Sequence, residues 1–257
     1  MRSKLYKIKR KVKKIIFTQY FKEFEKVQGP RLIYSDIPED EMQIINEVGK
    51  FSLTGTARLA SLIQAVKYIE HNNIQGSFVE CGVYKGGSVM AALRTLKNLG
   101  SLNRDFYLYD TFEGMPAPGS VDTTFEGNSA QAAFNEKNEF WDHILCYSNL
   151  EEVKENIQSC QYPSERIRYI EGKVEDTIPG VIPEKIAILR LDTDFYESTL
   201  HELEHLFPLL QKGGVLIIDD YGHWEGCRKA VDEYFKKNNI QIFLSRIDYS
   251  CRLAIKQ

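Results

Sequence analysis

The chain has 257 residues, with 33 basic against 36 acidic side chains and a formal net charge of -3 at pH 7. No apolar run approaches the 18 or so residues that span a bilayer, and the counts of 17 Gly and 8 Pro are ordinary, which excludes integral membrane, collagen-like and disordered proteins. The five cysteines are scattered and form no C-x-x-C pair, which excludes a disulfide scaffold and a zinc ribbon. We therefore expect a soluble globular protein of the reducing cytoplasm.

The first 16 residues carry eight Lys and Arg side chains and no acid, which leaves the rest of the chain with 25 basic against 36 acidic residues. Apolar residues recur in this segment at helical steps, at Leu5, Ile8, Val12, Ile15 and Ile16. The pattern predicts a basic amphipathic helix, and two interpretations stay open. Either its apolar stripe packs on the domain, or the helix contacts an anionic surface, namely the inner face of a membrane or a phosphate-bearing substrate. The acidic remainder argues against a nucleic-acid partner. We assign residues 1–25 to a helical extension and residues 26–257 to the main domain.

Helical periodicity at 40–48 and 57–71 precedes a region in which short β-branched or aromatic runs alternate with amphipathic stretches, as in a parallel sheet covered on both faces. The predicted parallel strands are 77–81, 106–109, 167–170, 186–191 and 215–218. The predicted helices among them are 88–99, 150–159, 198–210 and 226–237, the third closed by Gly213 and Gly214 as a left-handed cap. Two final runs, 241–247 and 252–255, are joined by a turn too short for a crossover and must pair as an antiparallel hairpin. The predicted fold class is α/β: a doubly wound, mostly parallel seven-stranded sheet with an antiparallel terminal hairpin and a helical N-terminal extension.

A glycine-rich turn follows the first predicted strand and opens a helix, as Glu80-Cys81-Gly82-Val83-Tyr84-Lys85-Gly86-Gly87-Ser88. It matches neither G-x-G-x-x-G nor a P-loop, so it does not specifically indicate phosphate. Asp110 ends the second strand, where an acid accepts hydrogen bonds from both hydroxyls of a ribose. Taken alone, Asp110 could equally cap a turn, but its register with the glycine turn favours a nucleoside site.

Four aspartates follow the fourth and fifth predicted strands: Asp192 and Asp194 after one, Asp219 and Asp220 after the next. Carboxylates that converge in one crevice repel one another unless a hard cation neutralises them, and oxygen ligands select Mg²⁺, Mn²⁺ or Ca²⁺ over zinc. We predict Asp192, Asp219 and Asp220 as metal ligands. The alternative is that Asp194 caps the next helix and that one of the pair at 219–220 begins a turn.

Two further segments have competing interpretations. The run His201-Glu202-Leu203-Glu204-His205 matches the H-E-x-x-H of zinc proteases, but helical projection places both His residues opposite the apolar face, toward solvent, and argues against a metal site. The stretch 111–130 is too long for an ordinary βα turn, and it is either a lid over a bound ligand or a surface excursion.

Four motifs together resemble the macrocin O-methyltransferase (TylF-like) family: FVECGVYKGGS at 78–88, YDTFEGMP at 109–116, LDTDFYEST at 191–199 and DDYG at 219–222. The resemblance extends from about Thr54 to Phe235 and does not cover the basic N-terminal segment. It implies a class I O-methyltransferase that depends on S-adenosylmethionine and Mg²⁺. It also implies an acceptor hydroxyl on a sugar, in a glycan, nucleotide sugar or glycosylated metabolite, and at least a dimer.

The resemblance also implies residue roles. The turn from Glu80 to Gly82 would hold the methionine part of the cofactor, Asp110 its ribose, and Glu175 the adenine. The full predicted cofactor set is Glu80, Gly82, Tyr84, Gly86, Ser88, Asp110, Glu175 and Thr54. Asp194 resembles the proposed general base, although the sequence does not rank it against Asp192.

Two other functional classes stay open at this level. A Rossmann-type NAD-dependent oxidoreductase would use the glycine turn and Asp110, but it leaves the strand-end aspartates without a role. A non-catalytic, membrane-associated partner protein would explain the basic segment, but not why every acid of the site is present.

Overall fold

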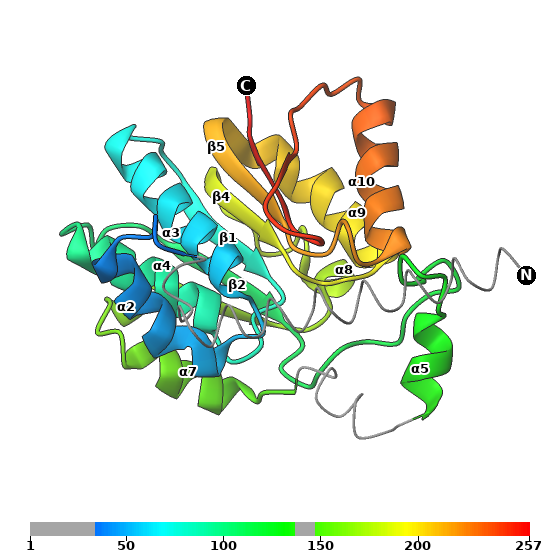
Figure 1. Cartoon of the computed structure of the whole chain (residues 1–257), viewed down its shortest axis with the longest axis horizontal. Helices are drawn as coiled ribbons and strands as arrows, with labels where there is room; N and C mark the ends of the chain where they lie inside the picture. The colour runs from blue at the N-terminus through cyan, green and yellow to red at the C-terminus, as the bar shows by residue number, and fades with distance from the viewer. Residues whose placement is uncertain (1–33, 137–146) are drawn as a thin grey trace, which may run out of the picture. The chain divides into compact units, whose positions relative to one another are not determined.

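The structure is a computed structural model that describes residues 34–136 and 147–257 (Figure 1). Within these residues, seven strands form one sheet in the order β3-β2-β1-β4-β5-β7-β6. The strands are β1 Ser77–Cys81, β2 Phe106–Asp110, β3 Ile167–Glu171, β4 Ile186–Leu191, β5 Leu210–Ile218, β6 Ser245–Arg246 and β7 Arg252–Ile255. The first five pair in parallel, whereas β7 is antiparallel to both β5 and β6. The predicted doubly wound, mostly parallel sheet with an antiparallel terminal hairpin is therefore confirmed.

The chain order reverses at the centre of the sheet, where β1 pairs with both β2 and β4. Every residue of β1 and β4 is buried, which explains why these strands read as continuous rather than alternating apolar runs. In a sheet of this kind, ligands bind beyond the carboxyl ends of the strands beside the reversal. The topology thus directs attention to the loops that follow β1, β2, β4 and β5.

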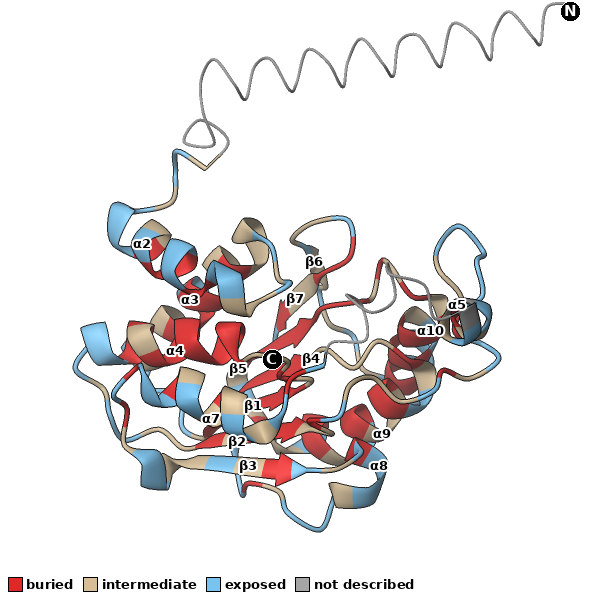
Figure 2. Ribbon diagram, turned by 90° about the horizontal axis from the view of Figure 1, so that it is seen from below, coloured by how far each residue is buried: buried red, intermediate tan, exposed pale blue. Residues whose placement is uncertain are grey.

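Helices cover both faces of the sheet. Their bounds are α2 Glu39–Val48, α3 Thr56–His71, α4 Gly87–Asn98, α5 Ala130–Glu136, α7 Leu150–Gln158, α8 Val174–Thr177, α9 Tyr196–Leu206 and α10 Glu225–Lys237. Figure 2 shows α3, α4 and α7 on one side of the strands and α8, α9 and α10 on the other. Apolar side chains of α9 and α10, including Leu203, Leu206 and Val231, join the strand residues Leu189 and Leu216 in one buried cluster.

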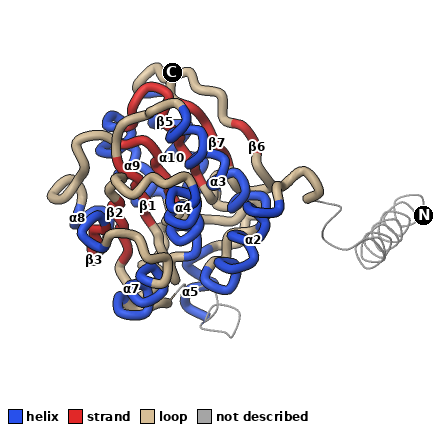
Figure 3. Tube along the Cα trace, turned by 90° about the vertical axis from the view of Figure 1, so that its left-hand side faces the viewer, coloured by secondary structure: helices blue, strands red, loops and turns tan. Residues whose placement is uncertain are grey.

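Three predicted boundaries were wrong. The helix predicted at 198–210 ends at Leu206 and tightens into a 3-10 turn at Phe207–Leu209 that contains Pro208, because proline cannot continue an α-helix. Gly213 has a positive φ of 81° but lies inside β5 rather than in a helix cap. There the register with β4 shifts from Ile186↔Leu210 to Ile188↔Val215, which marks a bulge. The strand predicted at 241–247 is reduced to β6, at the edge of the sheet beyond β7 (Figure 3).

The chain divides after Asp40, and Glu41–Gln257 forms one compact unit that contains the whole sheet. The predicted basic helix at 1–16 and the predicted boundary between 1–25 and 26–257 lie outside the described residues. No helix in the described ranges combines the length and apolar composition needed to span a bilayer.

Candidate active site

A cavity of about 650 Å³ lies beyond the carboxyl ends of β1, β2, β4 and β5. Its volume is in the range of small-molecule sites. Ten predicted site residues line it: Thr54, Gly82, Tyr84, Ser88, Asp110, Glu175, Asp192, Asp194, Asp219 and Asp220. Two predicted cofactor residues, Glu80 and Gly86, are not among the lining residues. The strand ends therefore gather most of the predicted site into one crevice.

The glycine turn is shaped by the approach of two strand ends. Gly82 has a φ of 85°, and a Cβ atom built there would lie 2.0 Å from the carbonyl oxygen of Asp192. Any larger residue would collide with that backbone, so Gly82 allows the loops after β1 and β4 to meet. Gly86 precedes α4, and a Cβ there would face Ile157 rather than the cavity.

Asp110 holds the second strand against the glycine turn. Its Oδ2 accepts hydrogen bonds from the amides of Val83 at 2.7 Å and Tyr84 at 3.0 Å, and its Oδ1 accepts one from Phe112 at 2.9 Å. The carboxylate thus braces the turn and also lines the cavity. Its role as a ribose ligand stays a prediction.

The other predicted cofactor residues differ in depth. Glu80 is fully buried and accepts hydrogen bonds from the Ser88 hydroxyl and from Arg190 at 2.6 Å. Burial raises the pKa of Glu80 to about 7, although Arg190 opposes the shift. Thr54 accepts a hydrogen bond from Arg190 at 3.0 Å, and Glu175 is an exposed residue of α8 at the cavity wall.

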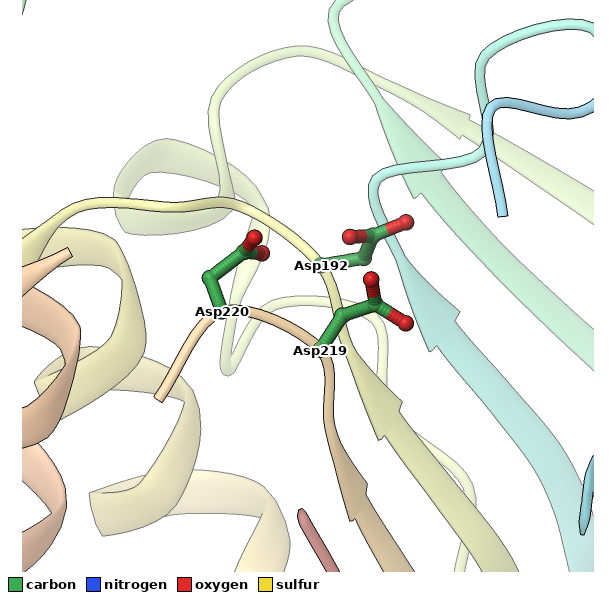
Figure 4. Close-up of side chains that lie close together, drawn as sticks. All are labelled: Asp192, Asp219 and Asp220. Atoms are coloured by element: carbon green, nitrogen blue, oxygen red, sulfur yellow. The ribbon is translucent and has the colours of Figure 1, made fainter. Parts of the chain in front are cut away.

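The three predicted metal ligands converge. Asp192 follows β4 and the pair Asp219 and Asp220 follows β5; because these strands are parallel neighbours, their ends coincide (Figure 4). One carboxylate oxygen of each residue lies within 4.8 Å of the others. Among the described residues this is the only group of three or more His, Cys, Asp and Glu with ligand atoms close enough to share an ion.

Two arginines contact this acid cluster, and neither was predicted. Arg190 is 2% exposed and pairs with Asp192 and Asp219 at 2.7 Å each, while Arg58 of α3 pairs with Asp219 and, at 2.6 Å, with Asp248. The sequence carried a signal for Arg190, because it is the one charged residue of β4. Arg58 had no such signal, since its partners lie 161 and 190 positions away.

The acid cluster suits a hard cation. Burial, with Asp219 adding like charge, raises the pKa of Asp192 to about 6 against the opposing Arg190. Burial and three neighbouring aspartates raise the pKa of Asp220 well above its usual range. The buried Oδ2 of Asp220 has no hydrogen-bond partner in the described part of the chain. The two arginines therefore do not neutralise the acids, and the donor set is oxygen only, which is the chemistry that Mg²⁺ and Ca²⁺ prefer.

Asp194 is held in an unusual backbone conformation beside the cluster. Its φ is 68°, in the left-handed region that non-glycine residues rarely adopt. The indole Nε1 of Trp224 donates a hydrogen bond to its Oδ1 at 2.8 Å. Burial and the charge of Asp192 raise the pKa of Asp194 to about 8, whereas the Trp224 bond acts to lower it. Trp224 was not predicted, although it follows Asp220 by only four residues.

The structure places the His pair of α9 differently from the helical projection. His201 and His205 are half-buried rather than directed to solvent, and Nε2 of His201 lies 2.9 Å from the carbonyl oxygen of Ile178. Neither lines the cavity. Glu202 between them is fully buried and accepts a hydrogen bond from the Thr193 hydroxyl at 2.9 Å. It therefore supports the loop that carries Asp192 and Asp194.

The stretch 111–130 forms part of the cavity wall. Asp122 is 2% exposed and accepts hydrogen bonds from the amides of Gly119 at 2.7 Å and Tyr196 at 2.9 Å. Met115, Phe125 and other residues of the stretch line the cavity. The stretch is thus anchored to the start of α9 and is more than a surface excursion, while its role as a lid stays a prediction.

A model of the Macrocin-O-methyltransferase (TylF) family matches residues 5–254. The match is therefore wider than the expected stretch from about Thr54 to Phe235, and it includes most of the basic N-terminal segment, which the resemblance was expected not to cover. The demethyldecarbamoylnovobiocin O-methyltransferase of Streptomyces niveus is 33% identical over 197 residues, which cover 77% of this chain and 72% of that protein. The 8-demethyl-8-(2,3-dimethoxy-alpha-L-rhamnosyl)-tetracenomycin-C 4'-O-methyltransferase of Streptomyces olivaceus is 34% identical, with the same 77% and 72% coverage. Among solved structures, that of the O-methyltransferase NovP has a TM-score of 0.70 at 31% identity, over 80% of this chain and 82% of the other.

Proposed function

The chain belongs to the macrocin O-methyltransferase (TylF) family and is an S-adenosylmethionine-dependent O-methyltransferase with a class I, Rossmann-like fold, and on that premise we propose that it methylates a hydroxyl of a sugar with the help of a divalent cation. The observation that carries the proposal is the convergence of Asp192, Asp219 and Asp220 in the same cavity as the glycine turn and Asp110. Family membership decides against the oxidoreductase and the non-catalytic alternatives.

The name of one relative supports a sugar as the acceptor. The Streptomyces olivaceus protein is named for a rhamnosyl-bearing tetracenomycin, which it methylates at a 4' position. By extension we propose a sugar-containing small molecule or glycan precursor as the acceptor of this chain.

We propose that Asp192, Asp219 and Asp220 hold Mg²⁺, with Mn²⁺ or Ca²⁺ as possible substitutes. A hard cation at this place lowers the pKa of a hydroxyl bound to it and fixes the orientation of that hydroxyl. Two observations support this assignment: Oδ2 of Asp220 has no hydrogen-bond partner among the described residues, and the acids outnumber the two arginines that contact them.

We propose Asp194 as the base that accepts the hydroxyl proton. Asp192 is the alternative, but its carboxylate is paired with Arg190 at 2.7 Å, whereas Asp194 receives a neutral hydrogen bond from Trp224. With its proton on Asp194, the acceptor oxygen would attack the methyl carbon of S-adenosylmethionine. The O–C bond would form as the S–C bond breaks, and the electron pair of the S–C bond would stay on sulfur, which leaves as the neutral thioether of S-adenosylhomocysteine. Tight positioning is the main requirement of such a displacement.

The cofactor is proposed to lie over Gly82, Tyr84 and Ser88, with Asp110 at its ribose and Glu175 near its adenine. These five residues all line the cavity. Glu80 does not line the cavity, and it would support the cofactor site indirectly, through its contacts with Ser88 and Arg190.

The test is methyl transfer from labelled S-adenosylmethionine to a panel of sugars, glycosides and nucleotide sugars, with chelator and with Mg²⁺ added back. Activity is expected to disappear with chelator and to return with Mg²⁺. Asp220→Asn should lose activity while still binding S-adenosylhomocysteine, and the exposed Asp176→Asn of α8 is the matched control. Full activity in chelator would refute the cation, and failure to transfer a methyl group to any oxygen acceptor would refute the whole proposal.

A peripheral contact with anionic lipid is a separate proposal that rests on charge alone. The eight cations of residues 1–16 can each add about 1 kcal/mol near an anionic leaflet, enough for reversible association at the cytoplasmic face. Deleting residues 1–16 should abolish binding to phosphatidylserine vesicles at low salt and leave transfer to a soluble acceptor unchanged. A full-length protein that ignores such vesicles would leave the segment with a packing or oligomer role.

A further inference from the structure

We propose that Phe125, His223 and Tyr249, which we call the aromatic rim, form an acceptor subsite that binds an uncharged glycoside and selects against a nucleoside diphosphate sugar. The inference rests on the proposed function, since it names the class of sugar acceptor that the site takes.

The aromatic rim joins three separate segments at the cavity. Phe125 belongs to the stretch 111–130, His223 to the loop between β5 and α10, and Tyr249 to the turn between β6 and β7. All three line the cavity, and their ring centroids lie 5.9 to 6.3 Å apart in edge-to-face pairs. Phe125 and Tyr249 are nevertheless each 53% exposed. Two large apolar side chains left open at the mouth of a cavity indicate a surface that a ligand covers.

Backbone contacts fix the positions of these rings. The amide of Phe125 donates to the carbonyl oxygen of His223 at 2.9 Å, and the amide of Gly222 donates to that of Ser250 at 2.8 Å. A Cβ atom at Gly222 would lie 2.0 Å from the carbonyl oxygen of Tyr249, so glycine is required for this close approach. Backbone contacts therefore hold the aromatic rim together, although its three residues come from segments that are far apart in the sequence.

The aromatic rim is one side chain away from the reacting groups. Arg58, which pairs with Asp219, lies 5.8 Å from the centre of the Tyr249 ring. Trp224, which donates to Asp194, lies 4.8 Å from the ring of His223, centroid to centroid. A sugar whose hydroxyl reaches Asp194 would therefore have the rest of its ring, or the group attached to it, against the aromatic rim.

The chemistry of the rim suits a carbohydrate. A pyranose has a C–H face that packs on aromatic rings and an edge of hydroxyls that needs hydrogen-bond donors and acceptors. Glu126 and Asn128, on the same stretch as Phe125, line the cavity and provide a carboxylate and an amide. Apolar rings with a few polar groups beside them form a typical small-molecule subsite.

The charge of the cavity disfavours phosphate. Among the described lining residues, seven side chains are acidic and two, Arg58 and Lys173, are basic. Arg58 is already paired with two aspartates, and Lys173 lies after β3, on the side of the cavity proposed for the cofactor. Beside the aromatic rim, no described residue forms an ion pair with Glu126. Among the described lining residues, a diphosphate at the rim would find no unpaired cation on its own side of the cavity, and it would be repelled by Glu126.

The first experiment compares paired acceptors that carry the same sugar: methyl glycosides and the corresponding nucleoside diphosphate sugars, with labelled S-adenosylmethionine and Mg²⁺. Transfer to one or more methyl glycosides, with a higher kcat/KM than for the paired nucleotide sugar, is expected. Transfer to nucleotide sugars alone would overturn the inference and leave the proposed function intact. Transfer to neither class would overturn both.

The second experiment tests the residues with the best methyl glycoside. Phe125→Ala and Tyr249→Leu should each raise its KM roughly three- to tenfold, with an unchanged dissociation constant for S-adenosylhomocysteine. Phe125→Tyr, which restores an aromatic face, should recover most of the loss, and Phe243→Ala, an exposed aromatic outside the cavity, is the control. Glu126→Lys should lower the ratio of kcat/KM for the methyl glycoside to kcat/KM for the paired nucleotide sugar. Unchanged kinetics in both ring-removing variants would overturn the inference.

Discussion

At the residue scale, Arg190 shows how a buried charge organises the site. Its guanidinium contacts Glu80, Asp192 and Asp219 at 2.6 to 2.7 Å, so one side chain connects the residue behind the glycine turn with two proposed metal ligands. A charged residue in the middle of a buried strand needs such partners, since an unpaired charge there would be costly. The sequence ILRL of β4 shows one charged residue within an apolar strand, but only the fold shows which acids pair with it.

Arg190→Met is expected to lower the free energy of unfolding by about 3 to 5 kcal/mol, because it leaves buried acids without their cation. Urea denaturation in chelator measures the change. Arg166→Met is the matched control, since its pair with Asp105 at 3.1 Å is exposed and should contribute about 1 kcal/mol or less. Similar losses in the two variants would argue that the buried network is not a structural element.

The hydrogen bond from Trp224 to Asp194 gives the second prediction at this scale. Trp224→Phe retains an aromatic ring against Phe195, whose centroid is 5.6 Å away, but removes the donor to Oδ1. We expect kcat to fall on the order of tenfold with the KM for S-adenosylmethionine unchanged. Because the lost bond favoured the ionised carboxylate, the pKa of Asp194 should rise, and the acidic limb of the rate profile should move to higher pH. A fall in kcat without that movement would assign Trp224 a packing role only.

At the scale of elements, features with a local cause in the sequence could be predicted, whereas features that depend on contacts between distant residues could not. Strands β1 to β5, the antiparallel end and the acids after β4 and β5 could be predicted, because apolar runs and chain order determine them. The short length of β6 could not be predicted, because within the run 241–247 only Ser245 and Arg246 pair with β7. Arg58 and Tyr249 reach the site from α3 and a hairpin turn, and contacts across so many residues leave no mark on local sequence.

Asp122 provides a test of one such contact. Its Oδ1 accepts from the amide of Tyr196 at the first turn of α9, and its Oδ2 accepts from Gly119. Asp122→Ala should therefore uncap α9 and release the stretch 111–130 together, lowering the free energy of unfolding by about 1 to 2 kcal/mol. The KM for the acceptor should rise while binding of S-adenosylhomocysteine, measured by calorimetry, stays the same. Equal weakening of both ligands would show that the whole cavity depends on this anchor.

At the scale of the whole molecule, the acid cluster lowers the stability of the fold at neutral pH but favours the binding of a cation. Burial, together with repulsion between neighbouring carboxylates, raises the pKa of Asp192 to about 6 and that of Asp194 to about 8. An acid with a raised pKa binds its proton more tightly in the native state than in the unfolded chain. Stability is therefore lost as pH rises from the unfolded value near 4 through the native value. The site carries this cost because the same repulsion favours a cation.

In chelator, the free energy of unfolding is accordingly expected to fall between pH 5 and pH 8. Added Mg²⁺ should reverse much of that fall, since a ligand that binds only the native state stabilises it and competes with protons for the carboxylates. The rise in Tm caused by Mg²⁺ should thus be larger at pH 8 than at pH 5, and it should be absent in Asp220→Asn. Thermal unfolding at the two pH values, with and without Mg²⁺, measures all three expectations. A rise in Tm of equal size at both pH values, or one that persists in Asp220→Asn, would mean that Mg²⁺ stabilises the protein from another place and that the three aspartates do not bind it.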